Sequence, residues 1–136
     1  MTAIESESIQ ISKSPQKVFN FLNDLRNYSK LISPDVGTVQ AEERSADLDV
    51  KGLGKFNISI EESRPNEYIR LLPSGKLPFS FNIEWRITGS GESCSVQGII
   101  NAKLNPFIRM MAEPKLRSFV EDQGHLLKTY LENEIE

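Results

Sequence analysis

The segment from Phe79 to Thr88 alternates strictly between apolar and polar residues, and this pattern restricts the fold more than any other feature of the chain. Successive side chains of a β-strand point to opposite faces of the sheet, so the segment presents one apolar face and one polar face. The apolar face is formed by Phe79, Phe81, Ile83, Trp85 and Ile87. Because this face is bulky and continuous, a second layer of structure must cover it.

Turn-forming residues recur throughout residues 37 to 104, and period-two patterns fill the intervals between them. Gly52-Leu53-Gly54 and Arg64-Pro65-Asn66 are two such turns, since glycine, proline and asparagine readily adopt turn conformations. The spacing predicts an antiparallel meander of about six strands in this region.

The turn at residues 89 to 92 indicates how two of these strands pair. Pairing across it predicts that Trp85 lies near Val96 and that Ile87 lies near Cys94. In this register the apolar sets of both strands share one face of the sheet.

Helical patterns flank the meander on both sides. Residues 3 to 12 favour a strand, and Ser14 and Pro15 then favour a helix start, because serine can cap the first turn and proline at the first position loses no hydrogen bond. Asp24 can cap a second short helix. From Phe107 onward the period is helical again, which predicts the longest element of the chain.

Pro114 lies inside this last helical segment. Proline removes one helical hydrogen bond and its ring collides with the preceding turn. The segment is therefore expected either to break into two helices or to kink at Pro114.

The segment Ser14-Pro15-Gln16-Lys17-Val18-Phe19 within residues 9 to 24, together with the order of the elements, resembles the helix-grip (SRPBCC) superfamily. This superfamily includes START-like lipid-transfer proteins, birch-pollen-allergen-like proteins and polyketide cyclases or dehydratases. The shared feature is a small residue, a proline, any two residues, a valine and an aromatic residue at the entry into the first helix. The resemblance implies an α+β fold, with a curved antiparallel sheet of about seven strands wrapped around a long C-terminal helix and two short helices after the first strand. It also implies a hydrophobic cavity between the sheet and that helix.

The composition excludes several kinds of function. The formal charge is −3 and the pI is about 5.3, which gives no electrostatic reason to expect binding to nucleic acid. Cys94 is the only cysteine and His125 the only histidine, so the chain can form neither an intrachain disulfide nor a multi-histidine metal site. We expect one domain over residues 1 to 136, with its own core and without a cofactor or metal.

The start of the sequence lacks the basic and apolar regions of a secretory signal, and no stretch is apolar enough for a membrane helix. We therefore expect a cytoplasmic protein without stable insertion in a membrane. The sequence does not predict the oligomeric state.

Bulky and flexible side chains on the apolar face favour a ligand pocket, since aromatic rings give rigid walls and methionine adapts to irregular shapes. The alternative is that these side chains simply fill a core. Met110 and Met111, close before Pro114, favour an entrance or a moving lid, the alternative being an exposed apolar loop. The predicted ligand-binding residues are Tyr28, Ile32, Ile58, Arg70, Phe79, Phe81, Ile83, Trp85, Met110, Met111 and Phe119.

The facing of Arg70 is open, because either Ile69 and Leu71 or Tyr68 and Leu72 can point inward. An inward Arg70 would need a buried anionic partner or ligand, since an unpaired buried charge is costly. The outward placement is therefore favoured.

The sequence shows no convincing pair of acidic and basic groups for catalysis, so we assign no catalytic residue and favour binding over an enzyme. The expected function is binding or transport of a small hydrophobic molecule, such as a lipid, an isoprenoid or a polyketide. A polyketide cyclase or dehydratase is one alternative, and it would require Tyr28, Arg70 and His125 to converge on one enclosed space. The other alternative is a protein-interaction module similar to chaperone activators, which would leave an exposed apolar patch.

Overall fold

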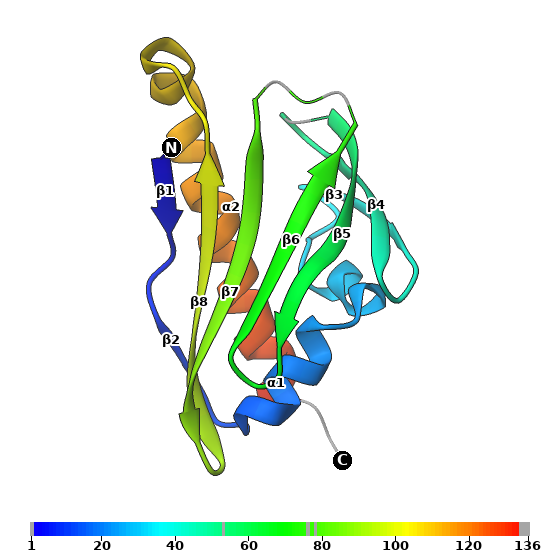
Figure 1. Cartoon of the computed structure of the whole chain (residues 1–136), viewed down its shortest axis with the longest axis vertical. Coiled ribbons are helices and arrows are strands. Elements are labelled where there is room, and N and C mark those ends of the chain that lie inside the picture. Colours follow the sequence, from blue (N-terminus) through cyan, green and yellow to red (C-terminus); the bar gives the residue numbers. More distant parts are fainter. Residues whose placement is uncertain (1, 53, 76, 78, 134–136) are drawn as a thin grey trace.

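The computed structural model describes residues 2–133 apart from residues 53, 76 and 78. In the described part of the chain, eight strands and three helices follow one another, and apart from the division of the first strand their order is the one that the sequence predicts (Figure 1). The elements are β1 Thr2–Glu5, β2 Ile9–Ile11, α1 Pro15–Leu22, η1 Leu25–Lys30, β3 Gly37–Ala41, β4 Ser45–Val50, β5 Gly54–Arg64, β6 Tyr68–Ser74, β7 Phe81–Ser90, β8 Ser93–Ala102 and α2 Pro106–Glu132.

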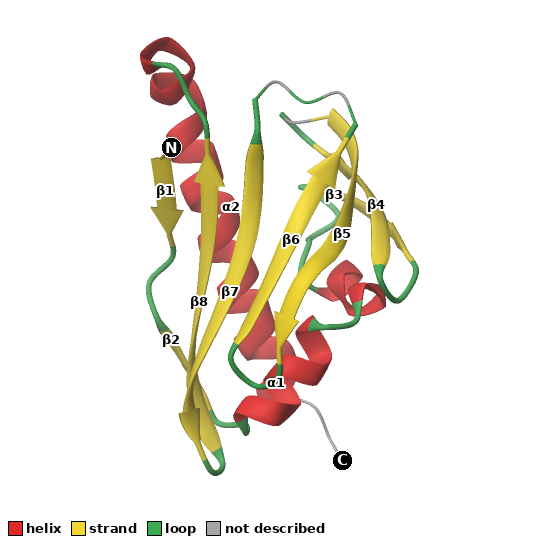
Figure 2. Cartoon of the chain, in the orientation of Figure 1, coloured by secondary structure: helices red, strands yellow, loops and turns green. Residues whose placement is uncertain are grey.

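All strands belong to one antiparallel sheet in the order β1-β8-β7-β6-β5-β4-β3, with β2 also paired to β8. The long helix α2 lies along one face of this sheet, and α1 and η1 sit near one end of it (Figure 2). The α+β helix-grip architecture is therefore confirmed. Of the predicted turn Gly52-Leu53-Gly54, Leu53 lies outside the described residues.

The two short helices begin where the sequence predicts them. Ser14 Oγ accepts a hydrogen bond from the Lys17 N–H at 3.2 Å, and Pro15 occupies the first helical position of α1. Asp24 Oδ1 accepts one from the Arg26 N–H at 3.0 Å and caps η1, which is a 3₁₀ helix. Both caps satisfy backbone donors that would otherwise have no partner.

The single strand expected over residues 3 to 12 is instead two strands, β1 and β2. Ile4 of β1 pairs with Ile100, and Ile9 of β2 pairs with Val96. The N-terminal segment therefore has one more residue between these two pairs than β8 has. An extra residue of this kind resets the alternation of side chains, and it allows Ile4 and Ile9 to be buried together.

The predicted pairing of β7 with β8 is wrong by two residues. Ile87 pairs with Val96 and Trp85 pairs with Gly98, because the turn contains only Gly91 and Glu92. A shift of two residues preserves the facing of every side chain, so the apolar sets still share one face.

Helix α2 runs without a break from Pro106 to Glu132, so of the two alternatives expected at Pro114 the division into two helices is excluded. Pro114 is exposed to solvent. The carbonyl of Met110, which the proline deprives of its helical partner, therefore lies on the side where water can reach it.

Two glycines bring α2 close to one side of the sheet. A Cβ atom on Gly98 of β8 would lie 2.9 Å from Val120 Cγ2, and one on Gly124 of α2 would lie 2.5 Å from Ile9 Cδ1. Both separations are shorter than ordinary van der Waals contact, so a side chain at either position would collide with its neighbour. The helix and the strands therefore approach this closely only because both residues are glycine. This contact draws α2 toward β8 and β2.

Candidate functional site

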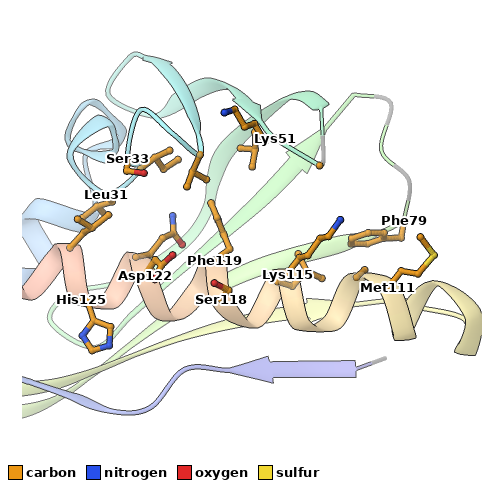
Figure 3. A pocket seen from close by; sticks show the side chains of 18 of the residues that line it. Leu31, Ser33, Lys51, Phe79, Met111, Lys115, Ser118, Phe119, Asp122 and His125 are labelled. Carbon is orange, nitrogen blue, oxygen red and sulfur yellow. The ribbon is translucent and has the colours of Figure 1, made fainter.

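A pocket of about 590 Å³ lies between α2, the segment that follows η1, and the end of β4 (Figure 3). Its volume is within the range of small-molecule sites, and its walls are mainly apolar. The apolar residues lining it are Leu31, Ile32, Val36, Val50, Phe79, Ile108, Met111, Ala112, Leu116, Phe119 and Leu126.

The wall contributed by α2 follows from helical spacing. Ile108, Ala112, Phe119 and Leu126 recur at intervals that place them on one side of a helix. The opposite wall begins at Leu31, the C-cap of η1, whose backbone N–H donates a hydrogen bond to the Tyr28 carbonyl at 3.0 Å. One face of α2 and the end of η1 thus form two opposite walls.

Polar groups occupy a few positions around this apolar interior. Lys51, Lys115 and Asp122 are exposed at the edge of the pocket, and Figure 3 shows Lys115 and Asp122 projecting from the same side of α2 as Phe119. Gln123 also lines the pocket but is buried, with 4% of its surface exposed. Among the described residues, Lys51 and Lys115 take part in no ion pair.

Four of the predicted ligand-binding residues come together in this pocket: Ile32, Phe79, Met111 and Phe119. They come from three separate parts of the chain, namely the segment after η1, the segment before β7, and α2. Met111 is 63% exposed and lies at the edge of the pocket, where an entrance was expected.

Five others belong to the core beneath the pocket rather than to its lining. Trp85 is 1% exposed, and the rings of Phe81 and Phe56 make an edge-to-face contact with centroids 5.7 Å apart. Such close contacts leave no free volume for a ligand at these positions. The five residues are Tyr28, Ile58, Phe81, Ile83 and Trp85.

Tyr28 has a structural partner for its hydroxyl group, which donates a hydrogen bond to the Leu22 carbonyl at 2.8 Å. Burial raises the pKa of Tyr28 well above its ordinary value of 10.0, so the phenol stays neutral. The residue therefore joins η1 to α1 inside the core.

Arg70 lies on the outer face of the sheet, as favoured from the sequence. Its guanidinium donates hydrogen bonds of 3.0 Å to Glu61 and of 3.0 Å to Glu62. Ile69 and Leu71 are the residues of this strand that join the core, which places the alternating Arg70 side chain on the other face.

Met110 does not line the pocket and is 81% exposed, and Phe107 on the same turn of α2 is 75% exposed. Together with Met111 these two side chains form an exposed apolar patch at the start of the helix. This patch is the feature that a protein-interaction module requires.

The groups considered for catalysis do not converge. Tyr28 is in the core, Arg70 is on the outer face, and His125 is an exposed residue at the edge of the pocket. In Figure 3 the His125 ring projects from the side of α2 opposite to Phe119. Glu121, one turn before His125, instead accepts a hydrogen bond from the Glu7 N–H at 3.0 Å.

Cys94 is buried, and burial raises the pKa of its thiol, so the reactive thiolate is disfavoured. In the part of the chain that the structure describes, no three His, Cys, Asp or Glu side chains are grouped to hold a metal ion. None of the described helices combines the length and the apolar character needed to cross a membrane.

Several lining residues were not foreseen from the sequence, notably Lys51, Lys115 and Gln123. A signal for the last two was present, because Lys115 lies four residues before Phe119 and Gln123 four residues after it. Positions four residues apart share a helix face, so both polar residues were placed beside a predicted site residue.

The sequence pattern described as polyketide cyclase / dehydrase and lipid transport matches residues 11–127 of the chain. The chain belongs to this family. The match covers α1, the whole meander and most of α2, and every residue that lines the pocket lies within it. No curated protein sequence matches the chain.

Solved structures of similar fold span the chain almost completely. The protein XoxI from Bacillus cereus has a TM-score of 0.73 at 14% identity, with 98% of this chain and 97% of that chain covered. A START superfamily protein from Mycobacterium smegmatis has a TM-score of 0.69 at 16% identity, with 96% and 97% covered. At these identities the likeness shows the fold alone.

The di-domain ARO/CYC protein BexL, from the BE-7585A biosynthetic pathway, has a TM-score of 0.69 at 13% identity. The superposition covers 98% of this chain and 48% of BexL. The chain therefore corresponds to about half the length of that di-domain protein.

Proposed function

We propose that this protein binds a small hydrophobic molecule, of the lipid, isoprenoid or polyketide kind, in the pocket between α2 and the segment after η1. The observation that carries the proposal is an open pocket of about 590 Å³ lined mainly by apolar side chains. Membership of a polyketide cyclase and lipid transport family supports a ligand of this class.

Ile32, Phe79, Met111 and Phe119 are the proposed apolar contacts, since they line the pocket from different elements. Burial of apolar surface supplies the driving force. A ligand that buries roughly 200 Å² of apolar surface gains about 5 kcal/mol before the cost of its lost freedom is subtracted.

Binding is favoured over a cyclase or dehydratase activity because Tyr28, Arg70 and His125 lie in three different environments. General acid or base catalysis needs a proton-transfer group within hydrogen-bond reach of the reacting atoms and usually a second group to orient it. A carrier or sequestering protein requires only the apolar walls.

The proposal is tested by titrating the protein with an environment-sensitive apolar dye of the anilinonaphthalene type. Ala112→Trp places an indole in the pocket and is expected to weaken dye binding about tenfold or more, because the filled volume no longer accommodates the ring. Ala112 is half-buried and lines the pocket.

Phe107→Ser with Met110→Ser is the matched control, since both side chains are exposed on the same helix and neither lines this pocket. Unchanged dye binding by this double variant, with loss in Ala112→Trp, supports the pocket as the site. Loss in the double variant with full binding by Ala112→Trp contradicts the proposal and assigns the dye to the exposed patch.

A further inference from the structure

We infer that the exposed apolar patch of Phe107, Met110 and Met111 binds a lipid surface that carries negative charge, and that this contact brings the edge of the pocket against the lipid. The contact is peripheral and reversible. Its purpose, the loading or release of an apolar ligand, rests on the proposed function, whereas the contact itself can be measured without any ligand.

The exposed large apolar side chains of this protein are concentrated on one turn of α2. In the described part of the chain four such side chains are exposed, and three of them are Phe107, Met110 and Met111. Helix positions three and four residues apart share a face, so the three side chains form one continuous surface. Single exposed apolar residues are ordinary, but a contiguous group marks contact with a protein or a membrane.

The charge around the exposed apolar patch is opposite in sign to that of the whole chain. The chain has a formal charge of −3, whereas residues 103–117 contain four basic residues and one acidic residue, Glu113. The basic residues are Lys103, Arg109, Lys115 and Arg117. A short basic segment that also carries exposed aromatic and apolar side chains is typical of helices that bind anionic lipid surfaces.

Two of these cations have no carboxylate partner within the protein. Glu113 pairs with Arg109 at 2.8 Å and with Arg117 at 3.4 Å. Lys103 and Lys115 take part in no ion pair among the residues that the structure describes. Both lysines are exposed, so their ammonium groups are available to lipid phosphates.

The exposed apolar patch is continuous with the pocket through Met111. Met111 and Phe79 both line the pocket, and Figure 3 shows them at the same end of it, with Lys115 further along α2. A lipid surface in contact with the patch therefore also meets the edge of the pocket. An apolar ligand can then pass between the surface and the pocket with little exposure to water.

The shape of this end of the molecule favours a lipid surface over a protein partner. Figure 1 shows that the first turn of α2 extends beyond the end of β8. A fluid lipid surface accommodates a protruding apolar group, and the basic side chains beside it keep their charged ends among the lipid headgroups. A protein partner or a second copy of the chain would instead need a hollow of matching shape.

The test is co-sedimentation with vesicles, without any added ligand. One set contains phosphatidylglycerol and phosphatidylcholine in equal parts, and the other contains phosphatidylcholine alone. The wild-type protein is expected to bind the anionic vesicles at least about fivefold more tightly, because each basic residue near an anionic surface contributes to binding. Raising the salt concentration from about 0.1 M to about 0.5 M should weaken this binding, since salt screens the charges.

Phe107→Ser with Met110→Ser tests the apolar part of the contact. This double variant is expected to bind the anionic vesicles about tenfold more weakly or less, because two side chains no longer enter the lipid. Leu72→Ser is the matched control, since Leu72 is the other exposed large apolar residue and lies on β6. It should bind the vesicles like the wild type.

Lys103→Glu tests the electrostatic part and is expected to weaken binding about fivefold or more. Arg44→Glu is its matched control, because it changes the net charge by the same amount. Arg44 is exposed in the turn between β3 and β4, at the end of β4 opposite to the pocket. Arg44→Glu should alter binding by less than about twofold. Thermal unfolding confirms that each variant is folded.

The outcomes separate this inference from the proposed function. Weaker vesicle binding by the double variant and by Lys103→Glu, with both controls unchanged, supports the lipid contact. Equal binding by the wild type and the double variant overturns it, as does failure of the wild type to bind the anionic vesicles.

If vesicle binding fails, self-association that the double variant abolishes assigns the exposed apolar patch to a second copy of the chain, and a protein that remains monomeric leaves the patch to a different protein. Both results overturn the lipid contact, and neither affects dye binding in the pocket. Vesicle binding by a wild-type protein that binds no dye contradicts the proposed function alone.

Discussion

Gly98 of β8 lies directly against Val120 of α2, so that a Cβ atom on the glycine would come within 2.9 Å of Val120 Cγ2 and 3.3 Å of Trp85 Cζ3. This contact sets the position of α2 on the sheet, because the helix cannot approach as closely if any side chain intervenes. The helix is thereby held near β8 on one side, and the pocket lies on the side facing η1 and β4.

Gly98→Ala is expected to lower the free energy of unfolding by about 1–3 kcal/mol, measured by chemical denaturation. Val120 is β-branched, and its side chain is stiff in a helix, so it cannot turn away from the added methyl group.

Gly124→Ala is the matched comparison. The added methyl group would meet Ile9 Cδ1, the flexible end of a side chain, and alanine gains about 1 kcal/mol of helix propensity over glycine. We expect a net change within about 1 kcal/mol of zero for this variant. A larger loss from Gly124→Ala than from Gly98→Ala would contradict this account of helix placement.

Pro114→Ala should stabilise the protein by about 1–3 kcal/mol, because alanine restores the N–H that can bond to the Met110 carbonyl and removes the clash of the ring. Pro106 occupies the first helical position of α2, where no such bond is lost. Pro106→Ala is therefore expected to change the free energy of unfolding by no more than about 0.5 kcal/mol. Equal effects of the two substitutions would show that Pro114 does not strain α2.

Glu132 joins the end of α2 to the segment after β2, since its carboxylate accepts a hydrogen bond from the Ser12 N–H at 2.9 Å and one from Lys128 Nζ at 3.0 Å. These hydrogen bonds, the Ser12 backbone N–H above all, lower the pKa of Glu132 below its ordinary value of 4.5. A lowered pKa in the folded state stabilises the protein above the unfolded pKa, and this stabilisation is lost as the pH falls through the folded value.

Glu132→Gln is therefore expected to lower Tm by a few degrees at pH 7, and the difference from wild type should shrink as the pH falls below about 4.5. Glu92→Gln, in the exposed turn between β7 and β8, serves as the control and should leave Tm almost unchanged. A Glu132→Gln difference that grows toward acid pH would show that the carboxylate stabilises the fold by another route.

Cys94 should resist alkylation in the folded protein, because it is buried and its thiol pKa is raised. We expect iodoacetamide to modify it at least about a hundredfold more slowly in the native protein than in denaturant. Comparable rates in the two conditions would indicate that the β7–β8 hairpin opens readily.

The local elements could be predicted from the sequence because their signals are local. The caps at Ser14 and Asp24 and the alternation that includes Ile83 and Trp85 depend on neighbours a few residues away. The register of β7 against β8 was wrong because it depends on which two residues form the turn. The local pattern around residues 89 to 92 did not distinguish a two-residue turn from a longer one.

The site could be predicted only in part. Alternation identifies the inner face of a sheet, but it does not show whether the space above Trp85 is filled or open. That depends on where α2 lies, which is determined by the approach of Gly98 to Val120 across the fold. Met111 and Phe119 were identified because their residue types suit a pocket wall, whereas Gln123 was missed because glutamine on a helix normally faces solvent.

Native mass spectrometry of the protein purified from its own host, under non-denaturing conditions and without added ligand, tests the central claim most directly. The wild-type protein is predicted to carry a co-purifying small molecule that is released on denaturation and is depleted in Ala112→Trp. Repeated recovery of the wild-type chain at its bare mass, from cells in which the protein is abundant and folded, would contradict the account.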